Sequence, residues 1–273
     1  MVKKVVFIFI LILSCSKEQN NNKVVNAAFN NVDSKDSGID FSNDLSLSGE
    51  LNIIEYLYYY NGGGVALGDI NNDGLDDVYL SANQKPDKLY LNLGGLKFKD
   101  ITLESGISQK ATWSTGVTMT DINNDGFLDI YVCNSGSIEG DNKQNELFLN
   151  QGDGTFKEQA EEYGLADQGF STHAVFFDYD KDGDLDVYIL NNSFIPVSSL
   201  NYSNKRDLRA KDWDVPEILK GGGDKLLENV NGKFEDVSEK AGIFGSLIGF
   251  GLGVTVSDVN GDLYPDIYVS NDF

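Results

Sequence analysis

Short apolar runs alternate with turns rich in Asp, Asn and Gly along most of the chain. Four stretches align without gaps, namely GVALGDINNDGLDDVYLS, GVTMTDINNDGFLDIYVC, HAVFFDYDKDGDLDVYIL and GVTVSDVNGDLYPDIYVS. They begin at Gly64, Gly116, His173 and Gly253. In each stretch a loop that starts with Asp joins two runs rich in Val, Ile, Leu, Phe and Tyr. This pattern predicts two β-strands joined by a tight loop in every repeat.

A second pattern follows the first three aspartate loops. It reads KLYLNLGGLKF from Lys88, ELFLNQGDGTF from Glu146 and KLLENVNGKF from Lys225, which predicts two further strands separated by a Gly or Asn turn. Four short antiparallel strands in roughly 50 residues is the size of one β-propeller blade. The sequence therefore predicts an all-β protein, a β-propeller with about three and a half blades present as an incomplete ring. Another all-β solenoid is the alternative.

The repeat also sets the boundaries that we expect along the chain. They are a signal peptide at 1–14, a lipid-anchored tether at 15–27, an N-terminal strand with its lead-in at 28–62, blade 1 at 63–115, blade 2 at 116–172, blade 3 at 173–248 with an insertion at 191–223, and the first half of blade 4 at 249–273.

Residues 28–39, AFNNVDSKDSGI, resemble the Phe-led last strand of a blade, so we expect a strand there. A strand shared between the first and last segments of the chain closes a propeller ring and hides its edges. The partner strands of this segment would lie beyond Phe273. We therefore interpret the sequence as an N-terminal fragment of a longer protein.

The first residues have the form of an export signal. Lys3 and Lys4 precede nine apolar residues, Val5 to Leu13, a run too short to span a bilayer. Cys15 follows almost at once, which resembles a bacterial lipoprotein signal with Cys15 as the lipidated N-terminus. An ordinary secretory signal with a chance Cys is the alternative. The lipoprotein interpretation places the chain in the bacterial cell envelope, at the outer membrane, on either its periplasmic or its outer side.

The charge of the chain excludes several classes of partner. It carries 43 acidic and 21 basic side chains, for a formal net charge of −22. Nucleic acids and anionic lipids both require a basic surface, so neither is an expected partner. The second cysteine, Cys133, lies in an apolar run, and with Cys15 acylated no internal disulfide can form. An exported chain without disulfides needs another source of stability.

Each aspartate loop offers side-chain oxygens at positions 1, 3, 5 and 9 and a backbone carbonyl at position 7. The expected metal ligands are Asp69, Asn71, Asp73, Leu75 and Asp77 in loop one, Asp121, Asn123, Asp125, Phe127 and Asp129 in loop two, Asp178, Asp180, Asp182, Asp184 and Asp186 in loop three, and Asp258, Asn260, Asp262, Tyr264 and Asp266 in loop four. Position 6 is Gly in the first three loops. Loop four has Leu263 there and Gly261 two residues earlier, so its geometry is the least certain to match.

So many carboxylates in one loop repel one another. At an effective dielectric constant near 20, each like pair at about 4 Å costs about 4 kcal/mol without a counter-charge. Ca²⁺ accepts many oxygen ligands and fits better than Mg²⁺, which keeps its waters. An EF-hand is excluded because position 12 carries no Glu and lies in a predicted strand. We therefore expect one structural Ca²⁺ in each loop; an Asx-rich turn without a metal is the alternative.

These motifs resemble the FG-GAP or VCBS repeats of integrin-α-type propellers. The wider pattern, including YYYNGGGVALGD, NELFLNQGDGTF and VNGDLYPDIYVSNDF, is similar to bacterial lipoproteins that carry such repeats ahead of an ASPIC/UnbV domain, in a cartilage-acidic-protein-like family. The resemblance implies a calcium-bearing propeller at the cell envelope with a role in binding or adhesion. It also implies a C-terminal domain that is missing from this chain.

Two features fall outside the repeat. The insertion between Asn191 and Gly223 holds a basic and aromatic cluster, Lys205, Arg206, Arg209, Lys211 and Trp213. Loops on rigid scaffolds commonly carry binding function, so this cluster is a candidate site for an anionic glycan or protein. A solvated loop or a brace between blades is the alternative. His173 takes the place of a Gly, either toward the propeller axis or packed on its strand, and Trp113 is expected in the core between blades.

Three functions remain open. A non-catalytic binding or adhesion scaffold, with an unknown glycan or protein ligand, fits four metal loops without a catalytic constellation. A structural spacer for a C-terminal domain is the second. A polysaccharide-acting enzyme needs Tyr, Lys, Arg and His on one face, and only His173 and the cluster at 205–213 hint at such a face. No G-x-S-x-G surrounds any serine, and we expect no catalytic activity.

Overall fold

A computed structural model describes residues 29–46, 52–54, 56–107, 113–136, 143–193 and 208–271. The chain divides into two compact units, 1–33 and 34–273, and every repeat lies in the second. In the described ranges, no helix combines the length and the apolar character that a membrane span requires. The predicted signal peptide, Cys15 and the tether lie outside the described residues.

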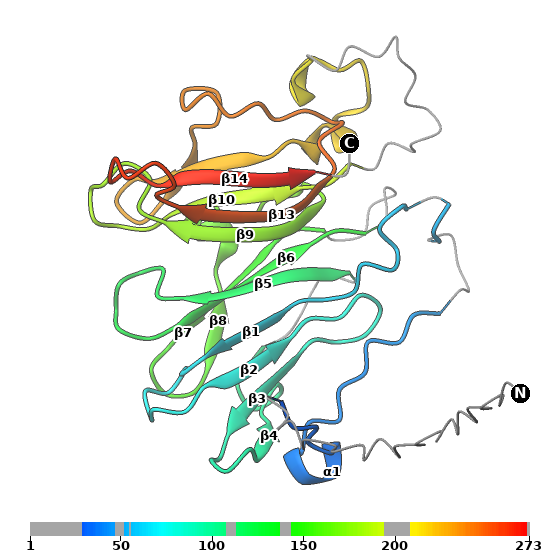
Figure 1. Ribbon diagram of the computed structural model, residues 1–273, viewed down its shortest axis with the longest axis vertical. Coiled ribbons are helices and arrows are strands. Elements are labelled where there is room, and N and C mark those ends of the chain that lie inside the picture. The colour runs from blue at the N-terminus through cyan, green and yellow to red at the C-terminus, as the bar shows by residue number, and fades with distance from the viewer. Residues whose placement is uncertain are drawn as a thin grey trace, which may run out of the picture. The chain divides into compact units, whose positions relative to one another are not determined.

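Three four-stranded antiparallel sheets and one two-stranded hairpin follow one another along the second unit (Figure 1). The first sheet contains β1 (Val65–Gly68), β2 (Asp77–Leu80), β3 (Lys88–Asn92) and β4 (Phe98–Asp100). The second contains β5 (Ser114–Thr120), β6 (Asp129–Asn134), β7 (Glu146–Asn150) and β8 (Phe156–Glu158). The third contains β9 (Ser171–Phe177), β10 (Asp186–Asn191), β11 (Lys225–Asn229) and β12 (Phe234–Asp236), and β13 (Gly251–Ser257) pairs with β14 (Asp266–Asn271).

Within each sheet the strands are neighbours in chain order. The all-β, β-propeller prediction is therefore confirmed, with three four-stranded blades and the first two strands of a fourth. The central residues of the second strands are apolar, and in blades 2 and 3 both faces of the sheet pack against neighbouring blades. All six residues of β6 and all six of β10 are buried. One apolar cluster joins blades 1 and 2, and another joins blades 2 and 3.

The first strands of successive blades lie against one another, β1 with β5, β5 with β9 and β9 with β13. Their close approach requires glycine, because a Cβ on Gly116 would lie 2.5 Å from the Thr172 carbonyl oxygen. The Thr115 hydroxyl donates across the same boundary to the Ser171 carbonyl at 2.7 Å. His173 holds the glycine position in β9 and packs half-buried against Gly116, where burial lowers its pKa.

The predicted N-terminal strand at 28–39 is not found among residues 29–46. Instead α1 (Ser34–Ser37) forms and ends at Gly38 with φ +84°. An outer strand needs a third strand as its hydrogen-bonding partner. In the part of the chain that is described, β14 pairs only with β13, so the expected site for this segment has no such partner.

The turn after each outer strand is nevertheless shared by this segment and the blades. Gly38, Gly106, Gly164 and Gly242 all have positive φ, and α2 (Ala160–Tyr163) precedes Gly164 as α1 precedes Gly38. Three of these glycines sit against the carbonyl of the Phe that begins the next outer strand. A Cβ on Gly38, Gly106 or Gly164 would lie 2.4, 3.3 or 2.5 Å from the carbonyl oxygen of Phe98, Phe156 or Phe234. The turn is therefore a joint between one blade and the next.

Trp113 is buried, as expected, and its neighbours include aromatic rings from the segment that leads into β1. Tyr56 meets it edge-on at 5.7 Å between ring centroids, and Tyr59 lies at 5.4 Å. Tyr58 packs against Phe250 of blade 4 at 6.1 Å. The YLYYY run thus links blades that are far apart in sequence.

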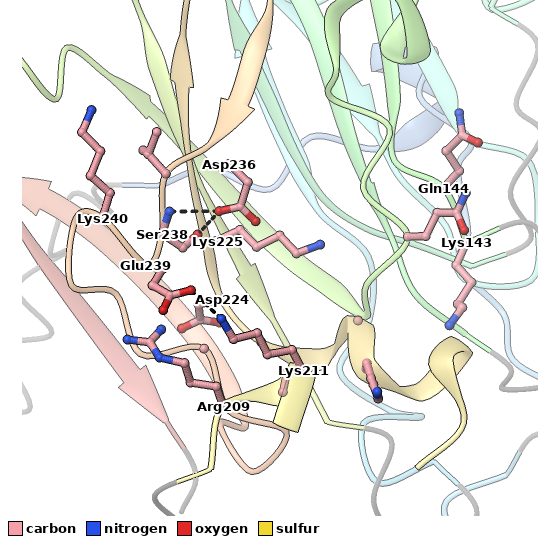
Figure 2. Close-up of a pocket in the computed structure, with 17 residues that line it drawn as sticks. Lys143, Gln144, Arg209, Lys211, Asp224, Lys225, Asp236, Ser238, Glu239 and Lys240 are labelled. Carbon is pink, nitrogen blue, oxygen red and sulfur yellow. Dashed lines mark hydrogen bonds and ion pairs between the residues drawn. The ribbon is translucent and has the colours of Figure 1, made fainter. Parts of the chain in front are cut away.

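The insertion of blade 3 forms two short 3₁₀ helices, η2 (Ala210–Asp212) and η3 (Glu217–Gly222), beside the turn that follows β12. Between these segments and residues 143–144 of blade 2 lies a cavity of about 950 Å³ (Figure 2). It is built from the connections before β7, before β11 and after β12. These connections lie at the opposite end of their strands from the aspartate loops.

Candidate functional site

The four aspartate loops connect the first and second strands of the blades and lie on the same side of the successive sheets (Figure 1). Neighbouring loops contact one another. The Asn72 side-chain amide donates to the Gly126 carbonyl at 3.0 Å, which joins loop one to loop two. The Lys181 ammonium lies 3.9 Å from the Tyr264 ring centroid, which joins loop three to loop four. Loops one and two are therefore in contact, as are loops three and four.

The backbone of each loop turns through two left-handed residues, at positions 4 and 6. These are Asn72 and Gly74, Asn124 and Gly126, Lys181 and Gly183, and Gly261 and Leu263. Loop four, whose sequence is irregular, thus keeps the backbone of the others: glycine has moved to position 4, and Leu263 takes position 6 with φ +69°. Each of the four loops therefore holds one non-glycine residue in this conformation, at a cost of about 1 kcal/mol.

Backbone N–H groups fix the carboxylates at positions 1 and 5. In loop one, Asp69 accepts from the N–H of Asp73 at 3.0 Å and of Gly74 at 2.7 Å. Asp73 in turn accepts from the N–H of Leu75 at 2.9 Å. The same bonds recur in loop two, at 3.0, 2.8 and 2.9 Å. For Asp69, partial burial raises the pKa, but these loop N–H groups outweigh it and hold the pKa below its usual value.

In the three full blades the carboxylate at position 9 is buried and bonds the loop to the third strand. Asp77 and Asp129 are 0% exposed and Asp186 is 1% exposed. One oxygen of Asp129 accepts from the Ile122 N–H at 3.0 Å, within the loop, and the other accepts from the Asn150 N–H at 2.9 Å, at the end of the third strand. The equivalent pairs hold Asp77 and Asp186. Burial raises the pKa of Asp129 to about 6.

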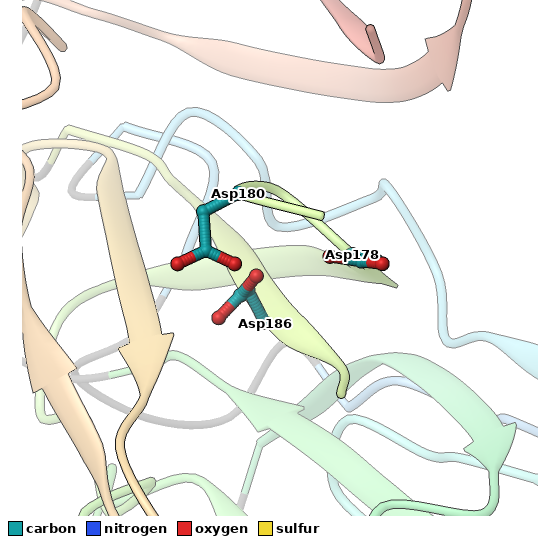
Figure 3. Close-up of side chains that lie close together, drawn as sticks. All are labelled: Asp178, Asp180 and Asp186. Carbon is teal, nitrogen blue, oxygen red and sulfur yellow. The ribbon is translucent and has the colours of Figure 1, made fainter. Parts of the chain in front are cut away.

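Loop three concentrates negative charge most strongly. Asp178, Asp180 and Asp186 each place a carboxylate oxygen within 4.8 Å of the other two (Figure 3). Asp184 Oδ1 is buried and has no hydrogen-bond partner among the described residues. Burial, together with the charges of Asp182 and Asp186, raises the pKa of Asp184 to about 6.

This donor set fits a hard divalent cation such as Ca²⁺, because carboxylate oxygens converge and one buried oxygen lacks a proton donor. In the other three loops, position 3 is Asn, whose amide donates to the position-5 carboxylate. The bonds are Asn71 to Asp73 at 3.0 Å, Asn123 to Asp125 at 2.9 Å and Asn260 to Asp262 at 3.0 Å. Leu75, Phe127 and Tyr264 lie at position 7, as expected, and donate their N–H to the position-5 carboxylate.

A buried side-chain hydrogen bond that recurs in each full blade was not identified from the sequence. The Tyr79 hydroxyl donates to Asp87 at 2.9 Å, and the other oxygen of Asp87 accepts from the Ala82 N–H at 2.7 Å. Tyr188 and Asp224 repeat the link in blade 3, and Tyr131 and Asn145 form it in blade 2. An Asp or Asn directly before each third strand was the available signal. Burial raises the pKa of Asp87 to about 7.

The basic cluster of the insertion is only partly described. Lys205 and Arg206 lie outside the described residues. Arg209 donates to the Ile243 carbonyl at 2.8 Å, and Lys211 forms an ion pair with Glu239 at 2.5 Å. Arg209 and Lys211 line the cavity, whereas Trp213 does not and donates its indole N–H to the Leu208 carbonyl at 3.4 Å.

Comparison with solved structures adds a weak likeness. A lectin from Agrocybe aegerita, described as specifically recognising non-reducing terminal N-acetylglucosamine, aligns over 74% of this chain and 45% of its own, at 16% identity and a TM-score of 0.36. At that TM-score the likeness supports neither a fold nor a ligand for this chain.

Curated relatives and a repeat family give a firmer result. Cartilage acidic protein 1 of Mus musculus is 28% identical over 221 residues, covering 78% of this chain and 29% of that protein. The Homo sapiens protein is 27% identical over 193 residues, covering 64% of this chain and 28% of its own length. This chain spans less than a third of the length of these relatives. Residues 69–132 and 136–189 match the family of FG-GAP-like repeats, and the chain therefore carries FG-GAP-like repeats.

Proposed function

We propose that this chain is a calcium-binding repeat lipoprotein of the bacterial cell envelope that acts as a non-catalytic binding or adhesion scaffold. The observation that carries the calcium assignment is the carboxylate cluster of Asp178, Asp180 and Asp186 in loop three. The buried oxygen of Asp184, in the same loop, supports it. The shared backbone of all four loops supports extending the assignment to loops one, two and four. FG-GAP-like repeats support a propeller-type binding scaffold.

Calcium has a structural role in this proposal. Each loop connects two neighbouring strands, so an ion held by positions 1, 3, 5 and 9 clamps the hairpin at its turn. The unfolded chain lacks this arrangement, so the free energy of ion binding becomes free energy of folding. That contribution replaces the disulfides that the chain lacks, since Cys133 is free and buried.

Thermal unfolding with and without calcium tests the metal assignment. One site at a calcium concentration about 100 times its Kd contributes about 2.7 kcal/mol to stability. For a domain of this size that raises the Tm by roughly 5–10 °C per occupied site. We expect a large rise of Tm in calcium over chelator and a smaller rise in magnesium. An equal Tm in calcium and chelator would overturn the assignment.

The scaffold role is tested separately from the metal. The calcium-loaded chain, immobilised at one end, is exposed to panels of envelope glycans and matrix proteins, with a chelator-treated sample as the control. Binding that depends on calcium and leaves the ligand chemically unchanged is the expected result. A chain that binds calcium but retains no ligand would point to the spacer role, and a ligand returned in altered form would point to an enzyme.

A further inference from the structure

The cavity beside the blade-3 insertion differs in charge from the rest of the molecule. Six of its lining side chains are cationic, namely Lys143, Arg209, Lys211, Lys220, Lys225 and Lys240. Three are acidic, namely Asp224, Asp236 and Glu239. More than a quarter of the 21 basic residues of a chain with net charge −22 therefore surround this one space. Such a local reversal of sign favours an anionic occupant.

Two of the three acidic side chains of the lining accept hydrogen bonds from the blade, and the third, Glu239, forms an ion pair with Lys211. Both oxygens of Asp224 accept hydrogen bonds, from the Tyr188 hydroxyl and the Asn191 N–H, each at 2.9 Å. Asp236 Oδ1 accepts from both the N–H and the hydroxyl of Ser238, at 2.9 and 2.5 Å (Figure 2). Their negative charge is thereby directed toward the protein, which reduces its effect on the cavity.

Contacts with the protein hold several of the cations in place, and for Lys211 and Lys225 these are ion pairs that offset part of their charge. The Arg209 guanidinium lies 5.2 Å from the Phe244 ring centroid while it donates to the Ile243 carbonyl. Lys143 is only 5% exposed, and its ammonium lies 3.9 Å from the Phe170 ring centroid. Lys225 is positioned by an ion pair with Asp167. Cations fixed before a ligand arrives lose little conformational entropy on binding.

The size and the uncharged lining of the cavity favour a sugar over a simple acid. About 950 Å³ lies at the upper end of the range for small-molecule sites and exceeds what a single small acid fills. Gln144, Gln168 and Ser238 add uncharged donors and acceptors, which suit hydroxyl groups between the anionic ones. A long polyanion is disfavoured, because beyond a Debye length of about 8 Å it meets only the acidic surface of the chain.

We propose that this cavity binds a short acidic oligosaccharide, whose carboxylate or sulfate groups pair with Arg209 and share Lys211 and Lys225 with Glu239 and Asp167. This inference rests on the proposed scaffold role and supplies a class of ligand for it. It uses different residues from the calcium loops, at the opposite end of the strands. Calcium binding and oligosaccharide binding can therefore succeed or fail independently.

Calorimetric titration of the calcium-loaded full chain tests the proposal. The probes are trigalacturonate for carboxylates, a sulfated disaccharide for sulfates, and galactotriose as the neutral control. Calcium is kept at the lowest concentration that saturates the loops, so that it does not bridge the acidic probes. We expect one site for an acidic probe and binding of galactotriose at least about tenfold weaker, a difference of about 1.4 kcal/mol. Which acidic probe binds better identifies the anionic group.

Two double variants separate the cavity from general surface charge. Lys211→Gln with Lys220→Gln removes two cations from the cavity lining and should weaken binding by about tenfold or more. Lys85→Gln with Lys99→Gln removes two exposed, ion-paired lysines elsewhere and should leave the affinity within about twofold. The single Lys211→Gln variant, at a largely exposed side chain, gives the same readout without risk to folding.

The proposal is overturned by any of three results. The first is a failure of both acidic probes to bind below about 1 mM. The second is equal affinity for galactotriose. The third is equal weakening by the two double variants. If calcium still raises the Tm in the same preparation, such a result removes the cavity as a site and leaves the calcium loops intact.

Discussion

At the scale of single residues, the aspartates of one loop have two separate roles. The sequence does not distinguish these roles, because the same aspartates recur in every loop. In the three full blades position 5 is exposed and is held by loop N–H groups, whereas position 9 is buried and bonds to the third strand. Both positions are Asp in all four loops, so the sequence predicts both as metal ligands. Only the pairing with Asn150 and its equivalents reveals the structural role of position 9.

Asp125→Ala and Asp129→Ala are expected to separate these roles in blade 2. Asp129→Ala leaves two N–H groups without acceptors and should lower the free energy of unfolding by about 3 kcal/mol even in chelator. Asp125→Ala should cost about 1 kcal/mol or less in chelator, because its side chain is exposed, yet abolish the calcium response of that loop. Chemical unfolding with and without calcium measures both; equal losses in chelator would contradict the assignment.

The link between Tyr79 and Asp87 predicts a dependence of stability on pH. Burial raises the pKa of Asp87 to about 7, above its value in the unfolded chain. The folded state therefore binds the proton more tightly, and the contribution is present below about pH 4 and lost as the pH rises through about 7. Asn145 already serves at this position in blade 2, where its amide donates to Tyr131 at 3.0 Å.

Asp87→Asn should therefore be tolerated and should gain stability over the natural chain as the pH rises. The pKa of Asp87 is raised from 3.8 to about 7, and each pKa unit corresponds to about 1.4 kcal/mol, so we expect a relative gain of about 4 kcal/mol between pH 4 and pH 8. The measurement is the difference in Tm between the two chains across this range, in constant calcium. A difference that does not change with pH would show that Asp87 does not titrate there.

At the scale of elements, the strands and their order were predictable because the apolar runs and turns repeat in a fixed pattern. The N-terminal segment shows no strand among residues 29–46, because the described part of the chain offers no third strand of blade 4 with which it could pair. The cavity was not predictable, since its lining comes from connections that are distant in sequence. The insertion drew attention to Arg209 and Lys211, but nothing in the sequence joined them to Lys143 of blade 2.

The glycine joints between blades give a prediction with an internal control. Gly164→Ala places a Cβ 2.5 Å from the Phe234 carbonyl oxygen in addition to an unfavourable φ of +78°. Gly242 has φ +80°, but nothing lies within 4 Å of the added Cβ. We expect Gly242→Ala to cost about 1 kcal/mol from the backbone alone, and Gly164→Ala to cost roughly 1–3 kcal/mol more. Equal losses in chemical unfolding would argue against the joint.

At the scale of the whole molecule, the cation-rich cavity stands out because the chain is otherwise so acidic. A net charge of −22 favours solubility but opposes compaction through self-repulsion, and bound calcium would relieve part of it. The same charge would keep the scaffold from lying flat on anionic lipid. A lipid anchor at Cys15 followed by a polar tether is compatible with that repulsion, since it holds the blades to a membrane without surface contact.

Replacement of the cysteine tests the proposed anchor. In a bacterial host that processes lipoproteins, the natural chain should be recovered with the membrane fraction and should incorporate labelled fatty acid. Cys15→Ala should lose both, because the acyl chains supply the membrane affinity. Cys133→Ala is the matched control, since that thiol is buried within blade 2 and should not affect fractionation. Membrane recovery of Cys15→Ala equal to that of the natural chain would refute the anchor.

The glycine joints also determine whether a destabilising substitution in one blade affects the other blades. Three of the joints contact the Phe that begins the next outer strand, and two of the apolar clusters each span a pair of neighbouring blades. Stability in such an array is close to a sum over blades and their shared boundaries. A defect in one of these boundaries therefore removes one increment of stability and spares distant blades, except through the aromatic cluster that joins Tyr58 and Trp113 to Phe250. The molecule is modular in this sense. The loops of one blade can change in length and sequence, as in the insertion of blade 3, without lowering the stability of the other blades.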